Sequence, residues 1–146
     1  MTQRTVYQSM PRRLLVSLSP SASVHEAACV MTRANCGSVL VVGAGTQLLG
    51  IVTERDLMTR VVAKAVDPSK TTLASVMTPN PRCIGPNTKV EDAVLIMLER
   101  GFRHLPVVGE GNTLLGVFSA RDAMPREIGA AVSLAEFNEQ VNDSLG

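Results

Sequence analysis

The chain has few aromatic residues and little net charge. Phenylalanine, tyrosine and tryptophan together make up 3% of its 146 residues, and tryptophan is absent. Aromatic platforms that stack the bases of a single strand are therefore not expected. The formal net charge of +1 gives little support for a nucleic-acid partner, which usually requires a basic patch. Nucleic acid is thus an unlikely ligand for this chain on composition alone.

Long apolar segments and paired cysteines are also missing. No apolar run approaches the roughly 20 residues of a membrane helix, so no membrane partner is expected. The apolar stretch Leu14-Leu15-Val16 is shorter than the roughly 7–15 residues of a signal peptide core. Cys29, Cys36 and Cys83 are an odd number without a paired spacing, which favours free thiols in a reducing compartment. We therefore expect a cytoplasmic protein.

What the chain does contain is an internal repeat. The segment Gly50–Asp56 (GIVTERD) corresponds to Gly116–Asp122 (GVFSARD), 66 residues further along. The same offset holds without a gap for about forty residues around the two segments, as it aligns Met31 with Met97. A chain of this length buries roughly 68–70% of its unfolded surface and can fold without disulfide bonds or bound metal ions. The sequence therefore predicts one module built from two small α/β units.

The first repeat shows a regular alternation of strand and helix signals. A short helical turn at Thr5–Met10 resembles one at Thr72–Met77, and each leads into a repeat. Ser23 begins a capping box, and the following apolar residues fall at helical spacing. The expected elements are a strand at 14–18, a helix from Ser23 to Asn35, hairpin strands at 38–42 and 48–52, and a second helix from Thr53 to Ala65.

The second repeat is expected to follow the same order. Its elements are a strand at 82–84, a helix from a capping box at Thr88, hairpin strands at 104–108 and 114–118, and a helix that ends near Pro125. A separate helix from a capping box at Ser133 carries an apolar stripe of Leu134, Phe137 and Val141. We therefore divide the chain into a first repeat with its lead-in (1–66), a linker with the second repeat (67–128) and a helical tail (129–146).

The motif at the end of each hairpin has two interpretations. Thr53–Asp56 and Ser119–Asp122 each place a hydroxyl three residues before an acid, directly after a strand. As a helix cap, the hydroxyl accepts from a free N–H group and the acid complements the positive helix end. As a ligand site, the helix start offers N–H groups to a phosphate, and the acid accepts from a ribose diol. Arg55 and Arg121 occupy the same position of the repeated motif, directly before the acid, and a helix cap does not require an arginine there.

Both repeats resemble the CBS domain, the cystathionine β-synthase-type repeat, and the pair resembles a Bateman module. The signatures are A-x-x-x-M in the first helix, the LPVV strand and LLG-h-h-[ST]-x-R-D, over about Val6 to Met124. The resemblance implies an α/β (α+β) fold of two β-α-β-β-α repeats related by a pseudo-twofold axis, with the sheets packed together and the helices outside. It also implies a homodimer and two clefts between the repeats for adenosyl ligands.

The resemblance assigns roles to matching positions. Ribose hydroxyls would be bound by Asp56 and Asp122, phosphate by Thr53 and Ser119, and adenine would lie beside Ile51 and Val117. In this family a cleft takes its acid from one repeat and its opposite wall from the other. Asp56 is therefore paired with Cys83, Ile84, Phe102, Arg103 and His104, and Asp122 with Ser17, Leu18, Cys36, Gly37 and Ser38.

The two clefts are expected to differ. Arg103 and His104 match family positions that reach phosphates, whereas the first repeat has the uncharged Gly37 and Ser38 there. A structural alternative leaves Arg103 exposed at a helix end and His104 satisfied in a turn. On the first interpretation we expect the cleft of Asp122 to bind nucleotide more tightly, although Arg103 also lines the wall opposite Asp56.

Three function classes follow. The preferred hypothesis is a stand-alone sensor that requires no cofactor, binds AMP, ADP or ATP, and signals to an unidentified regulated protein through a change in shape. The ligand could instead be S-adenosylmethionine or a dinucleotide. The alternative is a structural or interaction module with degenerate clefts. An enzyme is not expected, because no HExxH, CxxC or P-loop pattern occurs and neither His25 nor His104 has a cysteine or acid at ligand spacing.

Overall fold

The computed structural model describes residues 3–10 and 15–145, and its first repeat forms as expected from the sequence. β1 (Ser17–Leu18) is followed by α2 (Val24–Ala34) and by the hairpin strands β2 (Ser38–Val42) and β3 (Leu48–Thr53). The Ser23 hydroxyl accepts from the N–H of Glu26 at 3.0 Å and begins α2. Asn35 ends α2 in the left-handed conformation, at φ 52°. Leu14, the first residue of the expected strand, lies outside the described residues.

The helix after β3 changes type along its length. α3 (Glu54–Asp56) makes one α-helical turn, and Leu57–Val62 continues as a π-helix. The wider i→i+5 turns are rare, and they often occur at functional sites. The expected helix from Thr53 therefore exists, but most of it is not α-helical.

The second repeat has the expected main elements with a different helix start. α5 (Val90–Arg100) is followed by β5 (His104–Val108) and β6 (Leu114–Ser119), and Gly101 ends α5 at φ 74°. The capping box expected at Thr88 is wrong, because Lys89 is the N-cap and makes no side-chain cap hydrogen bond. The offset of 66 places Lys89 opposite Ser23, so the substitution removes the capping hydroxyl.

The strand expected at 82–84 is reduced to a single bridge between Ile84 and Val107. In the first repeat the N–H of Leu40 donates to the carbonyl of Val16 at 3.1 Å. The equivalent donor in β5 would be Pro106, which has no N–H group, so this ladder cannot extend. Instead, β4 (Thr78–Pro79) pairs with β3 and completes a sheet of order β1-β2-β3-β4, while β5 and β6 form a two-stranded sheet.

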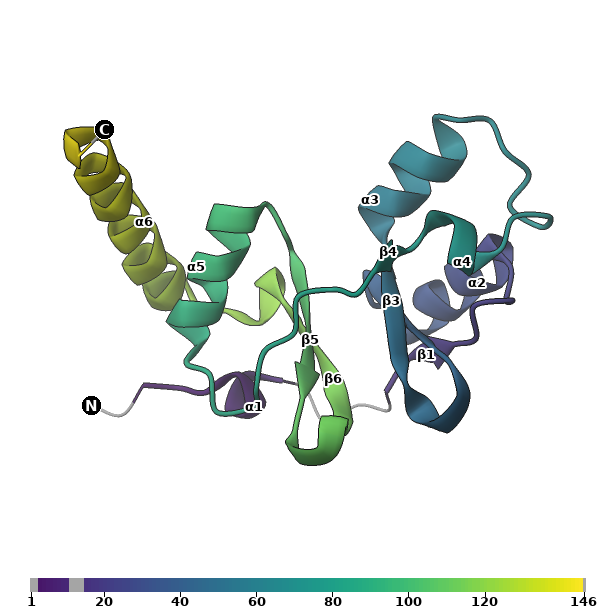
Figure 1. Cartoon of the computed structure of the whole chain (residues 1–146), viewed down its shortest axis with the longest axis horizontal. Helices are drawn as coiled ribbons and strands as arrows, with labels where there is room; N and C mark the ends of the chain where they lie inside the picture. The colour runs from purple at the N-terminus through teal and green to yellow at the C-terminus, as the bar shows by residue number, and fades with distance from the viewer. Residues whose placement is uncertain (1–2, 11–14, 146) are drawn as a thin grey trace.

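The C-terminal part of the chain is one helix, α6 (Pro125–Leu145). The expectation of a helix that stops near Pro125 and a separate one that begins at Ser133 is therefore wrong. Proline at the first helical position has a suitable φ and needs no N–H partner, so Pro125 begins a helix here. Ser133 lies in its interior. Ala131 is buried against the second repeat, and Figure 1 shows α6 beside α5 at one end of the molecule.

Each of the two lead-in turns packs on the repeat that it does not directly precede. α1 (Val6–Ser9) precedes the first repeat but packs on the second, where the N–H of Val6 donates to the carbonyl of Thr88 at 2.7 Å. α4 (Leu73–Val76) precedes the second repeat but packs on the first, where the N–H of Leu73 donates to Ala22 at 2.9 Å. Figure 1 shows α1 below α5 and α4 beside α2. The core of each repeat is therefore completed by the lead-in turn of the other repeat.

The hydrophobic residues form two cores, one in each repeat. Val39 and Val41 of β2 face the core of the first repeat, and Leu40 on the opposite face is also fully buried. Pro106 is the equivalent buried residue of β5. Because both faces of each hairpin are covered, the two sheets pack toward each other with the helices outside. This arrangement confirms the predicted fold class.

The described residues contain neither a membrane-spanning helix nor a cluster of three or more metal-binding side chains. Among residues 3–10 and 15–145, no helix has the length and apolar character needed to cross a bilayer. The same residues contain no cluster of three or more histidine, cysteine or acidic side chains that could hold a metal ion. The expectation that His25 has no cysteine at ligand spacing is wrong, because Cys29 Sγ, one helical turn away, lies 3.6 Å from His25 Nε2.

Candidate functional site

Two clefts lie between the repeats, one at the carboxyl end of β3 and one at the carboxyl end of β6. The larger, which we call the Asp56 cleft, has a volume of about 470 Å³ and is lined by both repeats. The smaller, the Asp122 cleft, has a volume of about 100 Å³. Cavities that take small ligands usually measure about 300–1,000 Å³. Of these two clefts, the Asp56 cleft falls in this range and the Asp122 cleft does not.

The Asp56 cleft contains most of the residues that the sequence assigned to it. The expected members present are Ile51, Thr53, Arg55, Asp56, Phe102, Arg103 and His104. Cys83 and Ile84 are not among them, because Ile84 lies in the core of the second repeat and Cys83 lines a separate hollow between the hairpin loops. Burial raises the pKa of the Cys83 thiol.

Sequence analysis missed several residues of this cleft. They are Glu54, Met58, Thr78, Pro81, Arg82, Arg100 and Gly101. Glu54 and Met58 adjoin the motif, and Arg82 precedes the predicted Cys83, so proximity in sequence could have found them. Arg100, the last residue of α5, lies two residues before the predicted Phe102 and could have been found in the same way.

The Asp122 cleft combines expected and unexpected residues. Cys36, Gly37, Ser38, Val117, Ser119, Arg121 and Asp122 line it as expected. Ser17 and Leu18 do not, since Ser17 lines the hollow between the hairpin loops and Leu18 packs on the first core. Met10, Leu15 and Val16 take their place.

Both acids act as helix caps. Asp56 Oδ2 accepts from the N–H of Thr53 at 2.9 Å and from the Thr53 hydroxyl at 3.2 Å. The Thr53 hydroxyl in turn accepts from the N–H of Asp56 at 3.4 Å, which completes the capping box. The Asp122 carboxylate accepts from the N–H of Ser119 at 2.9 Å. The capping interpretation of both motifs is therefore confirmed. Asp56 Oδ1 lies 3.7 Å from Arg60 Nε and retains the capacity to accept a further hydrogen bond.

The repeated arginines contact the opposite repeat. Arg121 donates to the carbonyl of Asn35 at 2.6 Å, and Arg55 donates to the carbonyl of Gly101 at 3.4 Å. Asn35 and Gly101 are themselves 66 residues apart, so the two contacts are related by the pseudo-twofold axis. Each arginine meets the negative end of a helix, α2 or α5, which favours a cation. The shorter bond holds Arg121 more firmly than Arg55.

Positive charge is concentrated in the Asp56 cleft. Its lining holds four guanidinium groups, those of Arg55, Arg82, Arg100 and Arg103, against the two carboxylates of Glu54 and Asp56. Arg103 lines this cleft but not the Asp122 cleft. One basis for expecting the Asp122 cleft to bind phosphate more tightly, the presence of Arg103, is therefore removed.

His104 lines both clefts and lies on the boundary between them. Burial lowers its pKa from the ordinary value; Glu54 and Asp122 oppose this effect, while Arg103 and Arg121 add to it. A side chain at Gly37 would meet the Glu54 carboxylate, and its Cβ would lie 3.0 Å from His104 Nε2. The glycine therefore leaves the space in which Glu54 and His104 approach each other.

Comparison with known proteins identifies both repeats. The CBS domain model matches residues 8–63 and 73–126. The chain is 41% identical over 101 residues to the meiotically up-regulated gene 70 protein of Schizosaccharomyces pombe, a match over 65% of this chain and 14% of that protein. It is 34% identical over 105 residues to an uncharacterized 17.7 kDa protein of Acidianus ambivalens, over 72% of this chain and 62% of that one. The chain thus spans less than two thirds of either relative.

A solved structure shares the fold. A CBS domain protein of Pyrobaculum aerophilum, complexed with AMP, has a TM-score of 0.77 to this chain at 24% sequence identity. The match covers 90% of this chain and 100% of that one. At this identity the likeness concerns the arrangement of the two repeats.

Proposed function

Because the chain belongs to the CBS-domain family, we propose that it is a regulatory module that binds an adenine nucleotide in the Asp56 cleft. The observation that carries the proposal is the concentration of four arginines around a buried aspartate in a cleft of about 470 Å³. A protein of the same fold binds AMP, which supports a nucleotide of this class. The module would pass the signal to a regulated protein by a change in shape.

The lining supplies a partner for each part of a nucleotide. Guanidinium groups bind phosphate with paired, charge-assisted hydrogen bonds, and Arg82, Arg100 and Arg103 add to the contribution of Arg55. The free capacity of Asp56 Oδ1 suits a ribose hydroxyl. Apolar surface for the base comes from Ile51, Met58 and Phe102.

The number of guanidinium groups in the cleft, more than its net charge, favours ligands with several phosphates. Four guanidinium groups against two carboxylates leave a net charge of +2, because 4 − 2 = 2. AMP, with a charge of about −1.5 to −2, already balances this net charge, whereas the longer phosphate chains of ADP and ATP allow more of the four guanidinium groups to make charge-assisted contacts. S-adenosylmethionine carries a sulfonium cation and is the least suitable of the adenosyl ligands considered, and a dinucleotide lies between these extremes.

The test is a calorimetric titration of the purified chain with ATP, ADP, AMP, S-adenosylmethionine and NAD. We expect affinity to fall in the order ATP, ADP, AMP, with S-adenosylmethionine last. At a hundred times its dissociation constant, a ligand should raise the free energy of unfolding by about 2.7 kcal/mol. If none of these compounds binds or raises the melting temperature, the proposal fails. Turnover of ATP would contradict the assignment of a binding role alone.

The Asp122 cleft is the candidate for a degenerate site that binds no nucleotide. The Asp122 cleft measures about 100 Å³, and its arginine already donates to Asn35. We therefore propose that this cleft has a structural role, so that the module binds one nucleotide. A ligand can shift the shape of the module only through its different affinities for two states. A single occupied cleft at the boundary between the repeats is sufficient for this.

A further inference from the structure

His25 and Cys29 form a pair of metal-ligating side chains on the exposed face of α2. The Ser23 cap begins this helix, and Ala27 and Met31 pack from its inner face into the first core. His25 and Cys29 lie four positions apart on the opposite, exposed face, where such residues are neighbours. Because helical side chains tilt toward the N-terminus, the later thiol leans back toward the earlier imidazole. The helix thus brings a sulfur and a nitrogen donor together, with Cys29 Sγ 3.6 Å from His25 Nε2.

This separation matches that of two donors on one tetrahedral zinc ion. Zinc binds a cysteine sulfur at about 2.3 Å and a histidine nitrogen at about 2.0–2.1 Å. With a tetrahedral angle of about 109° between these bonds, the sulfur and the nitrogen are about 3.5–3.6 Å apart. The two donors therefore already lie at the separation that a shared ion requires, and the helix need not rearrange to bind one.

The chemistry of the two donors selects the class of ion. A thiolate and an imidazole suit Zn²⁺, whereas Mg²⁺ and Ca²⁺ prefer oxygen ligands. The thiolate is the form that binds a metal, and the imidazole binds as the neutral base. Coordination of Zn²⁺ by this pair therefore forms one bond to sulfur and one to nitrogen, and releases the thiol proton to solvent.

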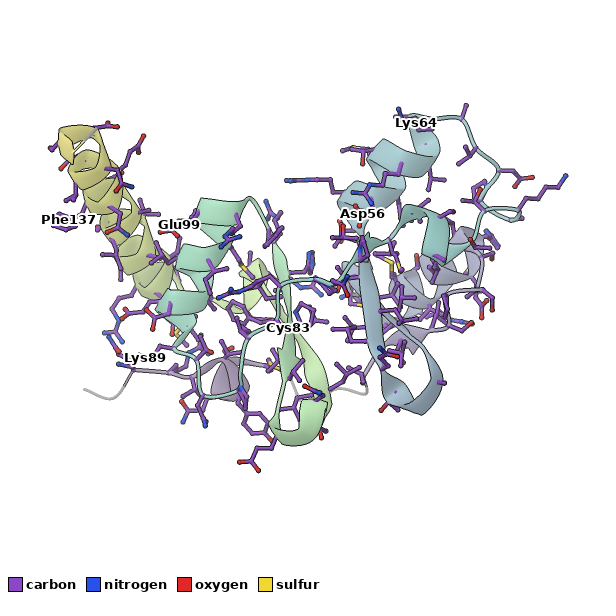
Figure 2. The ribbon with its side chains drawn as sticks, viewed as in Figure 1. Asp56, Lys64, Cys83, Lys89, Glu99 and Phe137 are labelled. Atoms are coloured by element: carbon purple, nitrogen blue, oxygen red, sulfur yellow. The ribbon has the colours of Figure 1, made fainter. Side chains whose placement is uncertain are left out.

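The other two cysteines have different surroundings. Cys36 Sγ donates to the carbonyl of Ser38 and Cys83 Sγ donates to the carbonyl of Pro81, each at 3.3 Å, and both cysteines are half-buried. Figure 2 shows Cys83 in the middle of the molecule, whereas Figure 1 shows α2 at one end. Of the three thiols, Cys29 alone is exposed and lies beside an imidazole.

The fold itself does not require this pair. The offset of 66 places Glu91 and Leu95 of α5 at the positions of His25 and Cys29. Glu91 accepts from the side-chain amide of Gln3 at 2.7 Å, and Leu95 packs on the second core. An equivalent helix therefore forms in the second repeat without a sulfur and nitrogen pair, so the pair is a property of the first repeat.

We infer that His25 and Cys29 together bind one zinc ion at an open site on α2, with water at the remaining positions. Neither residue lines the Asp56 cleft or the Asp122 cleft, so the inference does not depend on nucleotide binding. The described residues contain no group of three or more such side chains, which leaves two protein ligands for this ion. Structural zinc sites use four protein ligands, so this site binds zinc more weakly and exchanges it.

Titration with Co²⁺, a spectroscopic substitute for zinc, tests the ligands. The purified, reduced native chain is titrated without nucleotide. We expect one Co²⁺ per chain and a thiolate-to-cobalt charge-transfer absorption in the near ultraviolet. Addition of Zn²⁺ should abolish this absorption, whereas Mg²⁺ at the same concentration should leave it unchanged, because Mg²⁺ does not compete for sulfur and nitrogen donors.

Three single variants and a matched control identify the donors. Cys29→Ser and His25→Gln each remove one donor from an exposed position and should raise the zinc dissociation constant about tenfold or more, since even loss of an outer-shell partner costs about 10–100-fold. Cys29→His supplies a second imidazole, and should retain zinc binding without the charge-transfer absorption. Cys36→Ser is the control, and should change neither the dissociation constant nor the absorption.

Other outcomes overturn the inference. Binding only at millimolar zinc, or equal affinity in the native chain and the Cys29→Ser variant, would show that the pair is not a site. One ion per two chains would show that a second copy supplies the remaining ligands, which contradicts an open site. Circular dichroism checks the folding of each variant, and Cys29→His keeps the test decisive if Cys29→Ser or His25→Gln unfolds.

Discussion

The Asp56 and Asp122 clefts have the same motif at the same offset, but they use their charges differently. In the Asp122 cleft, Arg121 donates to Asn35 at 2.6 Å, and Arg4 donates to the carbonyl of Asp122 at 3.0 Å. In the Asp56 cleft, the corresponding bond of Arg55 is 3.4 Å long, and three further arginines line the wall. The repeated motif is a helix cap in both places, whereas the neighbouring residues surround the Asp56 cap, and not the Asp122 cap, with further arginines.

The largest expected difference is in nucleotide binding after removal of each acid. Asp56→Ala should raise the dissociation constant for ATP about tenfold or more, since a hydrogen bond to a charged group contributes about 1.5–3 kcal/mol. Asp122→Ala should change it less than about twofold. Calorimetric titration of both variants measures the effect. Thermal unfolding is the control, because each substitution also removes a helix cap worth about 1 kcal/mol. A larger effect at Asp122 would restore the order expected from the sequence.

The next effect concerns phosphate recognition by the wall of the Asp56 cleft. Arg100→Ala combined with Arg103→Ala should weaken ATP binding about tenfold and AMP binding less, because fewer charge-assisted contacts to the outer phosphates remain. Titrations with both nucleotides give the ratio. Arg33→Ala, which removes an exposed arginine of α2 outside both clefts, is the matched control and should leave the ratio unchanged. Equal losses for ATP and AMP would place the phosphates elsewhere.

Removal of an arginine should lower the free energy of unfolding more in the Asp122 cleft than in the Asp56 cleft, which is the reverse of the order expected for nucleotide binding. Arg121→Ala removes the bond to Asn35 that ties the repeats together, and should lower the free energy of unfolding by about 1 kcal/mol. Arg103→Ala should change it by less than about 0.5 kcal/mol. Urea unfolding of the two variants makes the comparison. If Arg103→Ala proves the more destabilising, the arginines of the Asp56 cleft are structural.

The smallest effect is a dependence of stability on pH at the boundary between the clefts. Burial lowers the pKa of His104 below its ordinary value of 6.5, so the unfolded chain binds a proton more readily than the folded chain. Stability should therefore be fully present above about pH 6.5 and should decrease as the pH falls from there through the lower folded pKa. Unfolding of the native chain and of His104→Gln across this range should show a shallower slope for the variant. Identical slopes would mean that burial does not lower the pKa of His104.

Local features of the fold could be predicted because they depend on neighbours in sequence. The turn at Asn35, the hairpins and the two caps each arise within a few residues, and the offset of 66 located their second copies. Two local errors also have local causes. Pro106 removes the donor that a strand at Arg82 needs, and Pro125 begins a helix that we expected it to end.

The sequence by itself determined the duplication, the two α/β units and the positions of the acids, because hydrophobic spacing and capping chemistry are encoded over short distances. Only the tertiary structure decided that each lead-in turn completes the opposite core, as Val6 and Leu73 do. It also decided that Arg82 and Arg100 line the same cleft as Asp56, whereas Arg121 is held by a backbone carbonyl. These are contacts between residues far apart in the chain, and no periodicity or motif specifies which of several cations reaches a given cleft.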